Sequence, residues 1–134
     1  MKKEYFKKKK NICSLYLWSF LLEIIVTALG ITVFSAVMFL TEWGYEYAPV
    51  FATVSIALGS FLSSFFHAKK SGEKGFISGL IIGGATFLII LIISLIVDSG
   101  AMTANTLFHF IIIMLSSLIG GILGVNKAKN KKYI

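Results

Sequence analysis

Residues 76–97 read FISGLIIGGATFLIILIISLIV, a run of 22 residues that contains no charged side chain. A helix needs about 20 apolar residues to cross the hydrocarbon core of a bilayer, so this run predicts a membrane span. Further spans are predicted at about 14–40, 48–68 and 107–125. The 134-residue chain is 57% hydrophobic and 14% charged, whereas a soluble domain has about 25% charged residues. We therefore predict a single transmembrane domain over residues 1–134, an all-α integral membrane four-helix bundle.

The distribution of charge predicts how the chain is oriented. All 13 basic residues are lysines. They flank the spans in three groups: Lys2, Lys3, Lys7, Lys8, Lys9 and Lys10; Lys69, Lys70 and Lys74; Lys127, Lys129, Lys131 and Lys132. In the two other connections, the charged residues are all acidic: Glu42, Glu46 and Asp98. Because lysine-rich short loops stay on the cytoplasmic side, we expect both termini to be cytoplasmic.

The lysine groups also indicate the kind of partner. Beside a membrane span, each lysine attracts anionic lipid head groups by roughly 1 kcal/mol. We expect such head groups at the cytoplasmic face, and no nucleic acid, because the sequence holds no base-reading module. The single cysteine, Cys13, excludes an intramolecular disulfide.

The second and fourth spans resemble each other. With a shift of 57 residues, residues 56–66 (IALGSFLSSFF) lie over residues 113–123 (IMLSSLIGGIL). The first and third spans align more weakly at a shift of 59 residues. Two readings stay open: duplication of a hairpin, which would give a parallel repeat about the membrane normal, or convergence on small residues in spanning helices.

Small residues recur every fourth position in three of the spans. Residues four apart share one helix face, and small faces let helices pack closely in lipid. The predicted packing residues are Ser55, Gly59 and Ser63; Gly75, Gly79 and Gly83; Ser116, Gly120 and Gly124. These faces would serve either packing within the chain or self-association.

Glu23 is the candidate intramembrane polar site. It lies about nine residues into the first span, or ~13 Å along the helix axis, with Ser19 and Thr27 on the same face. A charge inside the bilayer costs on the order of 2.5–3.5 kcal/mol. Three readings follow: an ion or proton site, a neutral acid hydrogen-bonded across an interface to Ser or Thr, or a side chain that reaches the cytoplasmic edge.

Motifs for catalysis, metal binding and cofactor binding are missing from the sequence. The two histidines, His67 and His109, are predicted at opposite faces of the bilayer as interfacial anchors, so they cannot share a metal. There is no HExxH and no phosphate-binding GxxxxGK[ST] sequence. We therefore expect no catalytic residue, no metal and no cofactor, and hence no enzymatic activity.

Two segments carry a family resemblance. They are SGEKGFISGLIIGG at residues 71–84 and SSLIGGILGVNKAK at residues 116–129. With the lysine-rich start and four spans, the chain from about Leu15 to Lys129 resembles the small uncharacterised four-span membrane proteins of low-GC Gram-positive bacteria. The resemblance implies a multi-pass protein of the bacterial cytoplasmic (cell) membrane. It implies no established activity and transfers no functional residue.

Two functions are compatible with these features. The first is a non-enzymatic packing, interaction or accessory subunit, bound to itself as a homo-oligomer or to a larger membrane partner. The second is a minimal dimeric transporter or channel with Glu23 in the ion or proton path. Four spans per chain are few for a transporter, so the second reading requires a dimer to enclose the path.

Overall fold

The computed structural model describes residues 1–42, 44–72, 74–97 and 104–132. It contains four long helices: α1 (Lys2–Thr41), α2 (Ala48–Ser71), α3 (Gly75–Val97) and α4 (Ala104–Lys132). A short 3-10 helix, η1 (Tyr45–Tyr47), precedes α2. By length and composition, each of the four helices could cross a membrane. The prediction of an all-α bundle with four spans is confirmed.

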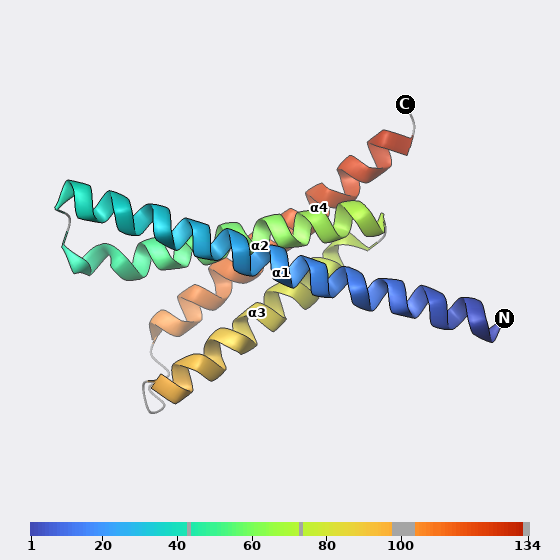
Figure 1. The fold of residues 1–134 in the computed structure, drawn as a ribbon, viewed down its shortest axis with the longest axis horizontal. Coiled ribbons are helices and arrows are strands. Elements are labelled where there is room, and N and C mark those ends of the chain that lie inside the picture. Colours follow the sequence, from blue (N-terminus) through green and yellow to red (C-terminus); the bar gives the residue numbers. More distant parts are fainter. Residues whose placement is uncertain (43, 73, 98–103, 133–134) are drawn as a thin grey trace.

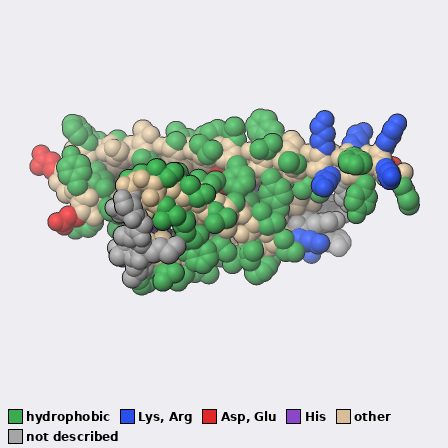
Figure 2. Space-filling view, turned by 90° about the horizontal axis from the view of Figure 1, so that it is seen from below, with side chains coloured by type: hydrophobic (Ala, Val, Ile, Leu, Met, Phe, Trp, Pro, Cys, Tyr) green, Lys and Arg blue, Asp and Glu red, His purple; other side chains and the backbone are tan. Residues whose placement is uncertain are grey.

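The helices form two antiparallel hairpins that cross each other (Figure 1). Helix α2 is central, because it packs against α1, α3 and α4. Both termini lie at the same end of the molecule as the α2–α3 turn (Figure 1). Figure 2 shows lysine side chains gathered at that end and acidic side chains at the other, with hydrophobic side chains between them. The orientation of the bundle in a membrane stays a prediction.

The ends of the helices follow local sequence signals. Pro49 lies in the first turn of α2, where its missing N–H costs no helical hydrogen bond. Gly72 caps the C-terminal end of α2. It has φ 68° and donates its backbone N–H to the Ala68 carbonyl over 2.9 Å. Glycine suits this left-handed position because it has no Cβ. Helix α1 begins at Lys2, well before the predicted span, because lysine and glutamate are good helix formers. The connection that carries Asp98 lies outside the described residues.

The interior consists of small and polar residues. The buried hydrophobic residues among those described are Ala68, Ile82 and Ile113, whereas eight of the buried polar residues are serine or threonine on α2, α3 and α4. Most large aliphatic side chains are exposed on the outside. This inverts the pattern of a soluble domain and suits a protein whose solvent is lipid, where close backbone contact rather than apolar burial holds helices together.

Each small-residue face meets a different neighbour within the chain. The glycine face of α3 lies against α4: a Cβ on Gly79 would come within 2.7 Å of the Ser117 carbonyl oxygen. A Cβ on Gly120 would collide with the Phe61 carbonyl of α2. A Cβ on Gly59 would collide with the Thr27 hydroxyl of α1.

The remaining members of these faces are placed as follows. Between α3 and α4, Gly75 meets Gly121, and Gly83 meets Ser117 and Met114. Between α4 and α2, Gly124 meets Phe65, and Ser116 is half-buried in the groove between the two helices. Between α2 and α1, Ser55 meets Gly30, and Ser63 bonds to Ser19. Gly84, which continues the α3 series in sequence, has open space where its Cβ would be. The faces therefore hold this chain together, and self-association through them would have to displace these contacts.

Serine hydroxyls connect the helices across these contacts. Ser63 donates to the Ser19 carbonyl on α1, and Ser117 donates to the Gly79 carbonyl on α3. Each hairpin thus has a serine on its second helix bonded to a carbonyl of its first helix. This shared feature supports a repeat, but duplication and convergence both produce it, so the relation between the hairpins stays a prediction.

Candidate functional site

Glu23 lies where α1, α2 and α3 meet. Its side chain is 5% exposed. Ser60 of α2 donates to Glu23 Oε1 over 2.8 Å, and the Thr86 hydroxyl of α3 lies 2.6 Å from the same oxygen. The carboxyl group therefore joins three helices, and its placement does not fit a side chain that reaches for the cytoplasmic edge.

Local sequence explains how the three helices come this close. Gly59 precedes Ser60 and has no side chain, so the α1 backbone at Glu23 can approach α2: an added Cβ would lie 3.2 Å from the Glu23 carbonyl oxygen. On α3, Thr86 follows Gly83 by three residues and shares its face. The small faces thus draw the backbones together, and the polar side chains beside them meet at the crossing.

The cluster offers more hydrogen-bond acceptors than the Thr86 hydroxyl can satisfy with its proton. The single Thr86 hydroxyl proton has two acceptors in reach: Glu23 Oε1 at 2.6 Å and the Ile82 carbonyl at 2.8 Å. A threonine in a helix commonly donates to the carbonyl four residues earlier. Thr86 therefore either donates to Glu23 Oε1, or donates to the Ile82 carbonyl while a protonated carboxyl group donates to Thr86.

The second carboxyl oxygen has no partner. Glu23 Oε2 is buried and makes no hydrogen bond within the described residues. An ionised carboxylate would leave a buried charged oxygen without a donor among the described residues, which costs far more than leaving the carbonyl oxygen of a neutral acid. The unpartnered Oε2 therefore favours the protonated form of Glu23, whereas the hydroxyl donors at Oε1 favour the carboxylate.

A bound metal ion fits this cluster poorly. Even a small cation such as Mg²⁺ holds its oxygen ligands at about 2.0–2.1 Å, which separates neighbouring oxygens by about 2.9 Å, more than the 2.6 Å between Thr86 and Glu23. Within the part of the chain that the structure describes, no group of three or more His, Cys, Asp and Glu residues could hold a metal.

The other two predicted polar residues also lie in the α1–α2 interface. Ser19 is fully buried and donates to the Leu15 carbonyl over 2.8 Å. Thr27 is half-buried and packs on Gly59. Glu23 lies one helical turn from each of these residues, and its Oε1 is bonded to Ser60 and Thr86 instead. The structure thus places the three residues along one seam, with Glu23 at its centre.

Three polar neighbours escaped the sequence analysis. Ser60 and Thr86 bond to Glu23, and both stand beside a predicted glycine face, which was the available signal. His67 was expected as an interfacial anchor, but it is only 2% exposed and packs on Tyr16 with ring centroids 4.0 Å apart. Its Nδ1 lies 3.3 Å from Ser19 Oγ.

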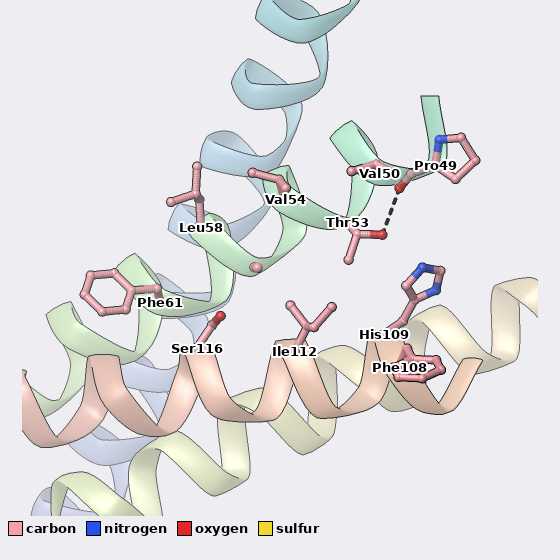
Figure 3. Close-up of a pocket in the computed structure, with 11 residues that line it drawn as sticks. Pro49, Val50, Thr53, Val54, Leu58, Phe61, Phe108, His109, Ile112 and Ser116 are labelled. Atoms are coloured by element: carbon pink, nitrogen blue, oxygen red, sulfur yellow. Dashed lines mark hydrogen bonds between the residues drawn. The ribbon is translucent and has the colours of Figure 1, made fainter. Parts of the chain in front are cut away.

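His109 lies apart from this cluster, in a groove between α2 and α4 (Figure 3). The groove has a volume of about 660 Å³ and a mostly apolar lining, with Thr53 and Ser116 as its polar members besides His109. The Thr53 hydroxyl is turned back to the Pro49 carbonyl over 2.8 Å. A second groove, of about 960 Å³, lies between α1 and α2 around Phe34, Ser35 and Phe51. Glu23 lines neither groove.

Comparison with known proteins gives a family and nothing beyond it. No curated protein and no solved structure matches the chain significantly. One family model matches residues 13–124, from the inner part of α1 to the last glycine of α4. The matched region contains the Glu23 cluster and all the small-residue faces. The chain therefore belongs to DUF3792, a family described as a protein of unknown function.

Proposed function

We propose that the protein is a non-enzymatic, multi-pass protein of a bacterial cytoplasmic membrane that binds and releases one proton at Glu23. The observation that carries this proposal is the enclosed carboxyl group, with two hydroxyls on Oε1 and none on Oε2. Ionisable groups within membrane spans are rare and commonly belong to ion or proton paths. In this reading, proton exchange at Glu23 drives transport through a dimer.

The chemistry of the site suits a proton that comes and goes. Ser60 can donate to either protonation state of Glu23, and Thr86 can switch its hydroxyl proton between the Ile82 carbonyl and Glu23. Loss of the proton from Glu23 therefore requires only a hydroxyl rotation at Thr86. Because the donors come from α2 and α3, the protonation state of one side chain on α1 affects the contacts among three helices.

Proton flux through purified protein in vesicles tests this proposal. Vesicles that enclose a pH-sensitive dye receive a pH step, and we expect the parent protein to dissipate the gradient faster than protein-free vesicles. Glu23→Gln, which keeps the shape but cannot release a proton, should abolish the increase. Glu46→Gln, at an exposed position in η1, is the matched control and should leave it unchanged. A parent protein without flux excludes autonomous proton transport.

The second candidate is an accessory subunit of a larger membrane partner. It is favoured by the absence of Glu23 from the lining of both grooves, since a partner could then complete the path to the carboxyl group. Purification in mild detergent separates the candidates. A stoichiometric larger transporter or enzyme would support the accessory role, whereas a homodimer would support transport by the protein itself.

A further inference from the structure

The seam between α1 and α2 is polar on only one side of Glu23. Towards the lysine-rich end, Ser63 donates to the Ser19 carbonyl over 2.8 Å, and His67 lies beside the Ser19 hydroxyl. Tyr16 covers the His67 ring. Helix α2 thus presents residues 60, 63 and 67 to residues 23, 19 and 16 of α1, and this polar file continues from Glu23 almost to the end of α2.

The opposite side of the seam is closed. Thr27 fills the space above Gly59, and a Cβ on Gly30 would lie 3.0 Å from Ser55. Further out, the rings of Phe34 and Phe51 stack with their centroids 4.9 Å apart. Tight contact at Gly59 and Gly30 thus separates Glu23 from the groove that Phe34 and Phe51 line.

The hydrogen bonds around Ser19 favour one tautomer of His67. The Ser19 hydroxyl proton points to the Leu15 carbonyl over 2.8 Å, so in the 3.3 Å contact the Ser19 oxygen is the acceptor and His67 Nδ1 is the donor. In a neutral ring Nε2 is then the atom that can accept a proton. Histidine can carry out this exchange because each of its two ring nitrogens can bind and release a proton.

We propose that protons enter and leave the Glu23 site from the lysine-rich end along the α1–α2 seam, and that His67 carries them at the entrance. A proton taken from water at Nε2 is balanced by one that leaves Nδ1 to the Ser19 hydroxyl. That hydroxyl passes its own proton through water in the seam to Glu23. Release reverses each transfer and restores the first tautomer. This inference rests on the proton exchange proposed for Glu23.

The titratable groups towards that end come from three helices. They include Cys13 and Tyr16 on α1, Lys69 and Lys70 on α2, and Lys127 and Lys129 on α4; the four lysines are exposed. The lysines stand in water, so the buried His67 is the group that connects them to the polar file. One turn of helix, about 6 Å, separates Ser19 from Glu23, a distance that bridging water can cover.

Infrared spectroscopy in vesicles tests the route. The carboxylic acid C=O band of Glu23, identified as the band that Glu23→Gln removes, shifts when its proton is replaced by deuterium after transfer to D₂O. We expect His67→Gln to slow this shift at least about tenfold, as expected for loss of a positioned proton-transfer group. His109→Gln, the control at the other histidine, should leave the rate unchanged.

The direction of the route is tested by a matched pair of serines on α2. Ser63 and Ser55 are both buried, at 0% and 1% exposure, and both face α1, but they lie on opposite sides of Glu23. Ser63→Ala should slow the exchange and Ser55→Ala should not. A variant that merely loosens the packing would exchange faster, so a structural effect has the opposite sign. Unchanged exchange in His67→Gln, or equal slowing in both serine variants, overturns the route.

The outcomes separate this inference from the proposed function. If the parent protein shows no carboxylic acid band that Glu23→Gln removes, Glu23 is not protonated and both proposals fail. If the band exists and exchanges at the same rate in His67→Gln, the proton site stands and the route through His67 fails. Slower exchange in His67→Gln and Ser63→Ala, with an unchanged rate in Ser55→Ala, supports the route.

Discussion

The Thr86 hydroxyl connects the most polar residue of the α1 span to α3, a helix that is otherwise almost entirely aliphatic. Its contact with Glu23 Oε1 is the shortest hydrogen bond at the site, at 2.6 Å. Hydrogen bonds between membrane helices average about 0.6 kcal/mol and reach about 1.7 kcal/mol. Removal of the Thr86 hydroxyl would also leave Glu23 with one hydrogen-bond partner instead of two.

We expect Thr86→Val, which keeps the side-chain shape, to destabilise the protein by about 1 kcal/mol. Thermal unfolding in detergent measures the change. The control is Thr32→Val: Thr32 also bonds to the carbonyl four residues earlier but is exposed, so its replacement should leave the melting temperature almost unaltered. Equal melting of the two variants would mean that the bond to Glu23 contributes nothing.

Glu23→Gln tests which protonation state the fold requires. Glutamine is uncharged like a neutral acid, and with its amide oxygen in the Oε1 position it can accept from both Ser60 and Thr86. We therefore expect its melting temperature in detergent at neutral pH to match that of the parent. A strong loss of stability in Glu23→Gln would instead indicate that the native site holds a carboxylate anion.

Helix α3 packs against α4 through its glycine face. A Cβ on Gly79 would lie 2.7 Å from the Ser117 carbonyl oxygen and 2.9 Å from the Leu118 Cα. Both are backbone atoms, which cannot move aside as a flexible side chain can. A larger residue must therefore separate α3 from α4 and stretch the bond from Ser117 to the Gly79 carbonyl.

We expect Gly79→Ile to lower the melting temperature in detergent, since overpacking costs about 1–3 kcal/mol, while membrane insertion stays unchanged. Gly84→Ile is the matched control, because its Cβ would meet open space in the same helix. Leu88→Ile, at an exposed position, is a second control that alters shape but not bulk. If Gly79→Ile melts no lower than Gly84→Ile, the contact between α3 and α4 is not tight.

The sequence predicted the elements well because span length and charge are local properties. The four spans followed directly from them. The partners did not follow: glycine spacing marks a close-packing face but not the helix it meets, and so Gly79 and Gly120 could not be assigned to α4 and α2. The same limit hid Ser60 and Thr86, which reach Glu23 only after three helices are brought together.

His67 shows why the polar seam was the hardest part to predict. Beside Lys69 and Lys70 it had the sequence context of an interfacial residue, and nothing local indicated that Tyr16 and Ser19 would enclose it. Burial here depends on the register between α1 and α2, which Gly59 and Gly30 determine through close contact with Thr27 and Ser55. A residue can therefore be read correctly as polar and near a helix end, and still be placed in the wrong environment.

The whole molecule carries its charges at two ends, and this asymmetry predicts its orientation. We expect tags at Met1 and Ile134 to report a cytoplasmic position. A cysteine introduced at the exposed Gly44 should react with an impermeant thiol reagent added outside intact cells. The experiment needs a Cys13→Ser background, because Cys13 is free and exposed. External reaction of either terminus would overturn the predicted topology.

The unequal lengths of the helices give the bundle a mechanical property. The lysine-free part of α1, residues 11–41, measures about 46 Å and α3 about 34 Å at 1.5 Å per residue, whereas the hydrocarbon core is about 30 Å thick. In a bilayer we expect the two helices to accommodate this mismatch by different tilts, in keeping with the crossed hairpins in Figure 1. A change in bilayer thickness should therefore change the angle at which α1 and α3 cross. The Glu23–Thr86 bond joins the two helices at that crossing. Thinner and thicker vesicles should shift the Glu23 C=O frequency in opposite directions, so that this frequency reports the thickness of the surrounding bilayer.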